Sequence, residues 1–265
     1  MLTRMEYHLQ QGLPLSCHSA SLFQGMLMQR IEPVYGEILH RSELKPYSQY
    51  LNCQENHTVW VLQTLTDDAT NQLITKPGLL ADDTIYIERL DMMVKITAVH
   101  RMSLSHEELL QQTFFSECPR TVKLRFVTPT AFKVQGRYQI YPTIQHIFGS
   151  LIQKYDAVHA QTEIAEDGLL EDLQRFISVI GYNLRSTFFS VEGVTIPSFT
   201  GTLLLKISGP QQLVNLVHLL LRFGTYSGVG IKTAMGMGAL QLIEKRKDDL
   251  HAGNTVSGRS GRPAP

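Results

Sequence analysis

The strongest constraint on the fold is an order of strand and helix patterns that occurs twice along the chain of 265 residues. In the first half, strand-like alternation marks four segments, at residues 4–11, 47–51, 58–65 and 84–102. The last of these is either one long strand or a hairpin. Between the first two lies a helical pattern that Pro33 divides into two pieces, and a short helix begins at Asp67. The resulting order, strand, helix, strand, strand, helix, strand, predicts a ferredoxin-like unit.

The second half of the chain repeats this order. Strand patterns span residues 121–127, 181–191, 200–208 and 239–243. Helical patterns cover residues 141–155, a stretch that ends near Ile180, and an apolar run that starts at Pro210. We therefore predict an α+β protein of two tandem ferredoxin-like (RRM-like) domains with antiparallel sheets. The domains are expected over residues 1–115 and 116–246, followed by a disordered tail over residues 247–265.

The composition narrows the class of protein. With 43% hydrophobic residues, the chain can bury the cores that two domains need. It has no run of 18 apolar residues that would span a membrane, and its start lacks the apolar stretch of a signal peptide. Cys17, Cys53 and Cys118 are widely spaced, which argues against a zinc site or a disulfide framework and for a reducing compartment. We expect a soluble, cytoplasmic protein without a membrane partner.

Charge is segregated along the chain although the formal net charge is zero. Residues 119–155 carry six lysines and arginines and no aspartate or glutamate, and residues 193–243 likewise contain no acid. Acidic residues gather instead at residues 163–172. This pattern is typical of a protein with one anion-binding side, although scattered, solvated charges would read the same way.

A glycine-rich segment, residues 224–238, has five glycines in fifteen residues. Such a density allows positive φ angles and close approach, and it predicts a loop that presents backbone N–H groups to an anion. The segment is not a P-loop, because Ile231 separates Gly230 from Lys232, and it lacks the third glycine of a dinucleotide fingerprint. The alternative is that these glycines serve only strand or hairpin geometry.

Several segments together resemble the CRISPR-associated endoribonucleases that cut precursor CRISPR RNA within its repeats. The most specific match is the glycine-rich signature over residues 226–238, preceded by Phe199-Thr-Gly201 and an apolar helix. Weaker matches lie at residues 12–14, 18–31, 39–40, 45–48, 126–133 and 141–148. The resemblance covers residues 1 to about 245 and implies tandem ferredoxin-like folds, a repeat-RNA substrate, and strand scission without metal or cofactor.

In that family the ribose 2′-hydroxyl attacks its own phosphorus, which gives a 2′,3′-cyclic phosphate product. The resemblance implies that His40 is the catalytic histidine, acting as general acid or base, and that Lys45 stabilises the scissile phosphate. His18 is the alternative to His40, and Arg41 is the alternative to Lys45. Some members use a tyrosine on the preceding helix, and this chain has none on the face from Phe23 to Met28.

The candidate RNA-binding residues belong to the glycine-rich segment and to basic positions elsewhere. They are Gly228, Gly230, Lys232, Thr233, Gly236, Gly238, Arg222, Lys133 and Arg137. Lysine and arginine at these positions would hold the RNA backbone without reading bases. CRISPR repeat RNA is the predicted partner, and a CRISPR effector complex and a homodimer are open alternatives for protein partners. Two other functions stay open at this point: a non-catalytic subunit that holds guide RNA, and a nucleotide-binding metabolic enzyme.

Overall fold

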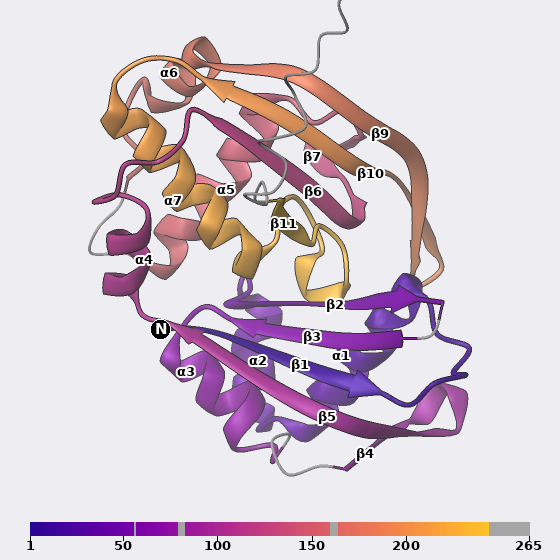
Figure 1. The fold of residues 1–265 in the computed structure, drawn as a ribbon. Helices are drawn as coiled ribbons and strands as arrows, with labels where there is room; N and C mark the ends of the chain where they lie inside the picture. The colour runs from indigo at the N-terminus through magenta and orange to yellow at the C-terminus, as the bar shows by residue number, and fades with distance from the viewer. Residues whose placement is uncertain (56, 79–82, 160–163, 244–265) are drawn as a thin grey trace, which may run out of the picture.

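The computed structural model describes residues 1–55, 57–78, 83–159 and 164–243, and it consists of two modules stacked one on the other (Figure 1). The predicted tail, residues 247–265, lies outside the described residues. The N-terminal module contains β1 (Leu2–Leu9), η1 (Cys17–Ser19), α1 (Ala20–Arg30), α2 (Pro33–Arg41), β2 (Tyr47–Gln54), β3 (His57–Thr64), α3 (Asp67–Thr70), η2 (Asn71–Thr75), β4 (Thr84–Ile87), η3 (Glu88–Leu90), β5 (Met92–Leu104) and α4 (His106–Gln112). The C-terminal module contains β6 (Thr121–Thr130), β7 (Phe132–Val134), β8 (Arg137–Gln139), α5 (Ile144–Val158), α6 (Leu169–Phe176), β9 (Ile177–Val191), β10 (Val194–Ile207), α7 (Gln211–Ser227), η4 (Thr233–Met235) and β11 (Leu240–Ile243).

Both sheets have the strand order of the predicted fold class. The N-terminal sheet runs β2-β3-β1-β5-β4 and the C-terminal sheet runs β11-β6-β10-β9, with antiparallel pairing throughout. In the N-terminal sheet β1 lies between β3 and β5, and in the C-terminal sheet β6 lies between β10 and β11. Strand β4 is an extra strand at the edge of the N-terminal sheet. The prediction of two tandem ferredoxin-like units with antiparallel sheets is confirmed.

Three details differ from the sequence-based expectation. Ile177–Ile180 belong to β9 and not to a helix, since a short apolar run fits either structure. The segment after β6 forms a small separate hairpin, β7–β8, that was not predicted. Gly224 to Ser227 lie in the last turn of α7, so the glycine-rich loop begins only at Gly228, the residue that caps this helix. The stretch predicted as one long strand or a hairpin is a hairpin, formed by β4 and β5.

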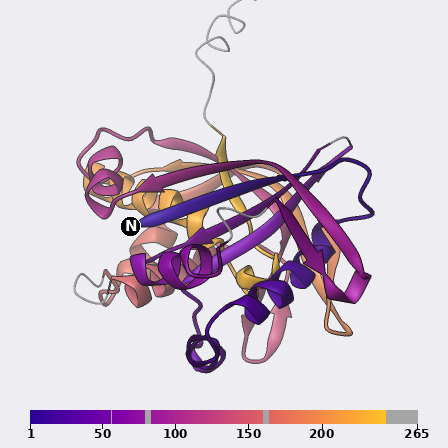
Figure 2. The same cartoon turned by 90° about the horizontal axis from the view of Figure 1, so that it is seen from below.

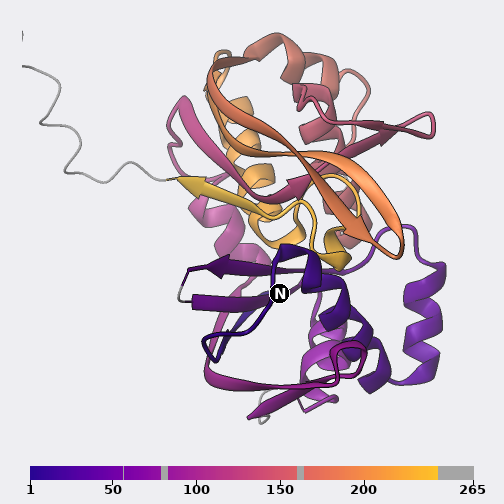
Figure 3. The same cartoon turned by 90° about the vertical axis from the view of Figure 1, so that its right-hand side faces the viewer.

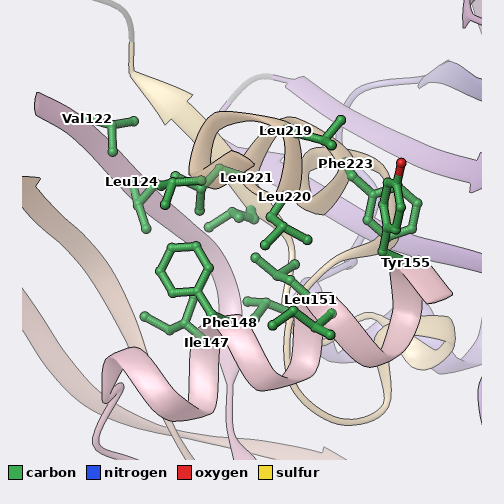
Figure 4. Packing of buried hydrophobic residues seen from close by; sticks show 14 of the residues in the cluster. Val122, Leu124, Ile147, Phe148, Leu151, Tyr155, Leu219, Leu220, Leu221 and Phe223 are labelled. Atoms are coloured by element: carbon green, nitrogen blue, oxygen red, sulfur yellow. The ribbon is translucent and has the colours of Figure 1, made fainter. Parts of the chain in front are cut away.

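The C-terminal core lies between its sheet and the two long helices α5 and α7. Figure 4 shows Phe148 and Leu151 of α5 and Leu220 of α7 packed against one another beside Leu124 of β6. A Cβ added at Gly224 would lie 2.8 Å from Leu151 Cδ2, so the glycine permits this close contact between the helices. Burial of these apolar side chains stabilises the module by about 25 cal/mol for each Å² removed from water.

The N-terminal core is centred on the only tryptophan of the chain, Trp60 on β3. Its ring stacks on Tyr7 of β1 at 4.8 Å and contacts Phe23 of α1 at 5.2 Å between ring centroids. The indole N–H donates to Gln49 Oε1 at 3.0 Å, so this buried polar group is satisfied. The sheet thereby holds α1 in place.

The two modules are joined by polar contacts from β2 and β3 to the end of α7 and to η4. Ser48 Oγ donates to the Tyr226 carbonyl at 2.5 Å, and Gln63 Nε2 donates to the Thr225 carbonyl at 2.6 Å. Gln49 Nε2 donates to the carbonyls of Ala20 at 2.8 Å and Ala234 at 3.1 Å. The glycine-rich segment is therefore fixed to the N-terminal module as well as to its own.

Two expectations from composition can be compared with the structure. Cys17, Cys53 and Cys118 are all free thiols. Among the described residues, no helix is both long and apolar enough to cross a membrane. The division of the chain at residues 115 and 116 stays a prediction; just before it, Leu109 of α4 packs into the C-terminal core.

Candidate functional site

A cleft of about 790 Å³ opens where the two modules face each other. Its walls are the segment after α2, the β7–β8 hairpin, the middle of α5 and the glycine-rich loop. Figures 2 and 3 show α2 standing away from α1, on the same side of the molecule as the β7–β8 hairpin. Pro33 at the first position of α2 separates the two helices, because proline cannot continue α1. The cleft therefore contains segments that are far apart in the sequence.

The cleft is positively charged. Its walls include four lysines, Lys45, Lys133, Lys154 and Lys232, and one carboxylate, Glu43. Lys133 is exposed on the hairpin, whereas Lys45 and Lys232 are half-buried. A concave surface lined by one sign of charge raises the local concentration of an oppositely charged ligand. The cleft has the electrostatic character of a site for an anionic chain.

His40 and Lys45 lie at one side of this cleft. His40 is exposed in the last turn of α2, and Lys45 follows the helix in the segment that lines the cleft. The Lys45 ammonium donates a hydrogen bond to the carbonyl of Ser42, the C-cap residue of α2, which holds it near the helix end. Partial burial lowers the pKa of Lys45. His40 itself is not among the residues that line the cleft wall.

The two alternative residues have other partners in the structure. Arg41 is exposed and pairs with Glu37 at 3.3 Å, one helical turn away. The Nδ1 atom of His18 accepts the Ser190 N–H at 3.2 Å, and its ring lies 5.3 Å from that of Phe189. His18 therefore attaches η1 to β9, and neither residue lines the cleft.

The glycine-rich loop is a tightly packed structure. Gly228, Gly230, Gly236 and Gly238 all have positive φ angles. An added Cβ would lie 2.3 Å from the Ala131 carbonyl oxygen at Gly230, 2.4 Å from Ala20 Cβ at Gly236, and 2.0 Å from the Val229 carbonyl oxygen at Gly238. These positions exclude any side chain both by conformation and by space.

The backbone amides of the loop are largely used within the protein. Val229 N–H donates to the Gly238 carbonyl at 2.8 Å, Ile231 N–H to the Ala131 carbonyl at 3.0 Å, and Gly238 N–H to the Pro129 carbonyl at 3.0 Å. Gly230 N–H donates to Ser150 Oγ at 2.9 Å. For these amides, the prediction that the loop presents unpaired N–H groups to an anion is wrong, because each of them already donates a hydrogen bond within the protein.

The structure separates the predicted RNA-binding residues into two groups. Lys133, Gly230, Lys232 and Thr233 line the cleft together with Lys45. The others lie outside its walls: Gly228, Gly236, Gly238, Arg222 and Arg137. The three glycines of this second group shape the loop, Arg222 is half-buried on α7, and Arg137 is exposed on β8.

Sequence reasoning missed two polar residues of α5, Ser150 and Lys154. Lys154 is only 8% exposed, and burial lowers its pKa to about 7. Its ammonium donates to the carbonyls of Ser227 at 3.3 Å and Gly228 at 3.2 Å and to Thr233 Oγ1 at 3.2 Å. A signal was present, because Lys154 falls at the seven-residue spacing from Ile147 that marks the buried stripe of this helix.

His146, also on α5, is a third residue that was missed. It lines the cleft, its ring stacks on Phe132 at 5.2 Å between centroids, and its Nδ1 lies 3.3 Å from the Tyr141 carbonyl oxygen. Since a carbonyl only accepts, Nδ1 is the donor in this contact. The sequence offered no spacing that marked this histidine.

Within the part of the chain that the structure describes, no group of three or more histidine, cysteine, aspartate or glutamate side chains is arranged to hold a metal ion.

The fold and the cleft define the class of protein: two ferredoxin-like modules around a lysine-lined cleft and a tightly packed glycine-rich loop. The family model described as CRISPR-associated endoribonuclease Cas6 matches residues 124–240. A Cas6 endoribonuclease of Streptococcus thermophilus is 36% identical over 85% of this chain and 91% of its own length. One of Mycobacterium tuberculosis is 33% identical over 91% of this chain and 78% of its own length. The chain therefore belongs to the Cas6 family of CRISPR-associated endoribonucleases.

Solved structures agree with this assignment at the level of the fold. A Cas6 product complex has a TM-score of 0.77 at 23% identity and covers 92% of this chain and 100% of that chain. A Thermus thermophilus Cas6 has a TM-score of 0.69 at 24% identity over 92% of this chain and 98% of that chain. The similarity extends across both modules.

Proposed function

We propose that the protein cleaves precursor CRISPR RNA within its repeats to give guide RNAs, with the cleft holding the RNA and His40 and Lys45 acting on the scissile phosphate. The family assignment supports the endoribonuclease and does not favour the two alternatives, a non-catalytic guide-RNA subunit and a nucleotide-binding metabolic enzyme. Hand-over of the product to an effector complex, a homodimer and a cytoplasmic location remain predictions.

The single observation that carries the site assignment is the position of Lys45. It lines the cleft together with Lys133 and Lys232, and it is five residues downstream of His40, just after the end of α2. An RNA backbone bound along the lysines would pass this point with a phosphate near both side chains. Arg41 and His18 fit less well, because Arg41 pairs with Glu37 and His18 accepts a hydrogen bond from β9.

The proposed reaction needs alignment, proton transfer and positive charge. The ribose 2′-oxygen forms a bond to the adjacent phosphorus, the bond to the 5′-oxygen of the next nucleotide breaks, and a 2′,3′-cyclic phosphate results. His40 accepts the proton of the 2′-hydroxyl or donates one to the leaving oxygen, as an imidazole can near neutral pH. The Lys45 ammonium stabilises the negative charge that develops on the phosphate oxygens.

The test combines repeat RNA, a chelator and one substitution. Wild-type protein should cut the RNA in the presence of the chelator, and His40→Ala should bind the RNA but cut more slowly by about 10²- to 10⁴-fold. His57→Ala is the matched control, since His57 is an exposed histidine of the same module at the start of β3. It should cut as the wild type does.

A 2′-deoxy substitution at the cut site gives an independent check of the reaction. It should abolish cutting and leave binding intact, because it removes only the attacking hydroxyl. Intact RNA after incubation with the wild-type protein would overturn the nuclease assignment. Unchanged cutting by His40→Ala would remove His40 from the site.

A further inference from the structure

Helix α5 faces the protein core with a stripe of apolar side chains, but two polar residues interrupt this stripe. Ser150 and Lys154 are four residues apart and therefore lie on the same face of the helix. Ser150 Oγ accepts the Gly230 N–H at 2.9 Å, and the Lys154 ammonium contacts Ser227, Gly228 and Thr233. Both residues thus reach the glycine-rich loop, and they do so at different points along it.

The environment of Lys154 is costly for a charged group. The side chain is only 8% exposed, and its three hydrogen-bond acceptors are two carbonyls and a hydroxyl, with no carboxylate among them. Burial of an ammonium without a counter-ion is unfavourable, and the carbonyls at the negative end of α7 offset only part of this cost. An apolar residue would fill the same position of the stripe without that cost, so packing alone does not explain the lysine.

The acceptors of Lys154 explain its presence better. Ser227 and Gly228 mark the point where α7 ends and the loop begins, whereas Thr233 lies in the middle of the loop. One ammonium therefore joins the start of the loop to its centre. Thr233 directly follows Lys232, whose backbone is in the left-handed region at φ 51° and whose side chain lines the cleft. The contact to Thr233 fixes the segment that carries Lys232.

We propose that Lys154, together with Ser150, is a positioning residue that holds the glycine-rich loop in its RNA-binding form and so directs Lys232 toward the RNA backbone. This inference rests on the proposed function, since it assigns RNA binding to the cleft that the loop lines. Lys154 acts through the loop, because its donors are directed at Ser227, Gly228 and Thr233. The glycines permit the backbone conformation of the loop, and the hydrogen bonds from α5 stabilise that conformation.

The experiment first measures the loop without RNA. Hydrogen–deuterium exchange over residues 228–239 is compared for wild type, Lys154→Met, Ser150→Ala and Lys154→Arg. Lys154→Met should speed exchange of the amides of Val229, Gly230 and Gly238 by about tenfold or more, and Ser150→Ala should do so to a smaller extent. Lys154→Arg keeps a cation with several donors and should restore part of the protection.

The second measurement separates binding from cleavage. Lys154→Met should raise the Kd for repeat RNA by several-fold and leave the single-turnover cleavage rate at saturating RNA within about threefold of wild type. A merely destabilising substitution would lower the folded fraction and would not weaken binding by the folded protein. Lys95→Met, which removes an exposed charge on β5, is the matched control and should change neither quantity.

Two outcomes would overturn the inference. Unchanged loop exchange in both Lys154→Met and Ser150→Ala would show that α5 does not hold the loop. Faster exchange with an unchanged Kd would show that the ordered loop does not serve RNA binding. Because the exchange measurement uses no RNA, a failure of the proposed function appears separately, as a wild-type protein that does not bind repeat RNA.

Discussion

The two modules share one strand order but differ in the connections that their sheets carry. In the N-terminal module the first helix is broken at Pro33 into α1 and α2, whereas in the C-terminal module it is the single helix α5. The connection from the second helix to the last strand includes β4 in the N-terminal module and is the compact loop of residues 228–239 in the C-terminal one. The differences therefore fall on the segments between elements of a common fold.

If the proposed function holds, these differences assign the reaction mainly to one module and RNA binding mainly to the other. The broken helix places His40 and Lys45 at the end of an outlying segment, where they are reached from solvent. The loop of the other module is tightly packed and mostly buried, with Lys232 at its accessible side. We expect substitutions in the first region to change the reaction and substitutions in the second to change structure and affinity.

The largest expected effect is on folding, at Gly236. Gly236→Ala would place a Cβ 2.4 Å from Ala20 Cβ at a φ of 111°, and it should lower the free energy of unfolding by about 3 kcal/mol or more. Gly193→Ala is the matched control, since Gly193 also has a positive φ of 77° but no atom within 4 Å of an added Cβ. It should cost about 1 kcal/mol. Urea unfolding measures both, and equal costs would contradict the tight contact between the modules.

The next largest effect is expected on the reaction, at Lys45. Lys45→Met should slow single-turnover cleavage by about 100-fold, since it removes the cation proposed to stabilise the developing charge. The Kd for RNA should change by less than about threefold, because the other lysines of the cleft remain. If rate and affinity fell together, Lys45 would belong to the binding surface rather than to the reaction.

A smaller effect is expected on the pH dependence of stability. Burial lowers the pKa of Lys154 to about 7 from an ordinary value of 10.5, so between these pH values the unfolded chain binds more protons than the folded one. Stability from this group should therefore rise with pH above 7, on the order of 1 kcal/mol per pH unit. Urea midpoints measured from pH 7 to 9 should show this slope in wild type and a flatter profile in Lys154→Met. If the wild-type and Lys154→Met profiles ran parallel, Lys154 would remain protonated in the folded protein over this pH range.

The smallest effect is expected at the surface cations. Lys232→Met should weaken RNA binding by several-fold and reduce the slope of log Kd against log salt by about one, as expected for one lost phosphate contact. Arg222→Met should change the Kd and the salt slope less than Lys232→Met does, because Arg222 lies on α7 outside the cleft walls. A larger effect at Arg222 than at Lys232 would indicate that the RNA runs over α7 and not through the cleft.

The fold was largely predictable because periodicity reports which face of an element is buried. The errors lie where periodicity is weak. The three-residue strands β7 and β8 are too short to show alternation, and of the two turn residues with positive φ, Gln135 and Gly136, only the glycine gives a turn signal. Residues 177–180 are an apolar run that suits a strand or a helix equally.

The sequence could propose site residues only where they are local in sequence. His40 ends α2 and Lys45 follows that helix, and the resemblance to a family implied a role for both, which stays a prediction. The roles of Ser150 and Lys154 depend on contacts to residues about 75 to 80 positions away, which no local pattern records. The glycines were recognised, but Gly236 packs against Ala20 of one module and Gly230 against Ala131 of the other. No local pattern records these contacts, so the sequence suggested an exposed backbone where the structure has a packed one.

The contact of Gln49 with Ala20 and Ala234 has a consequence for how the protein is made. Residues 228–239 leave the ribosome after almost every segment that holds them, including α1, β2 and α5. The cleft can close only when this last segment joins partners that have already been synthesised, and such long-range contacts form late in folding. A nascent chain would therefore carry His40 long before it carries all the walls of the proposed RNA-binding cleft, so RNA capture would have to wait until residues 228–239 have been made.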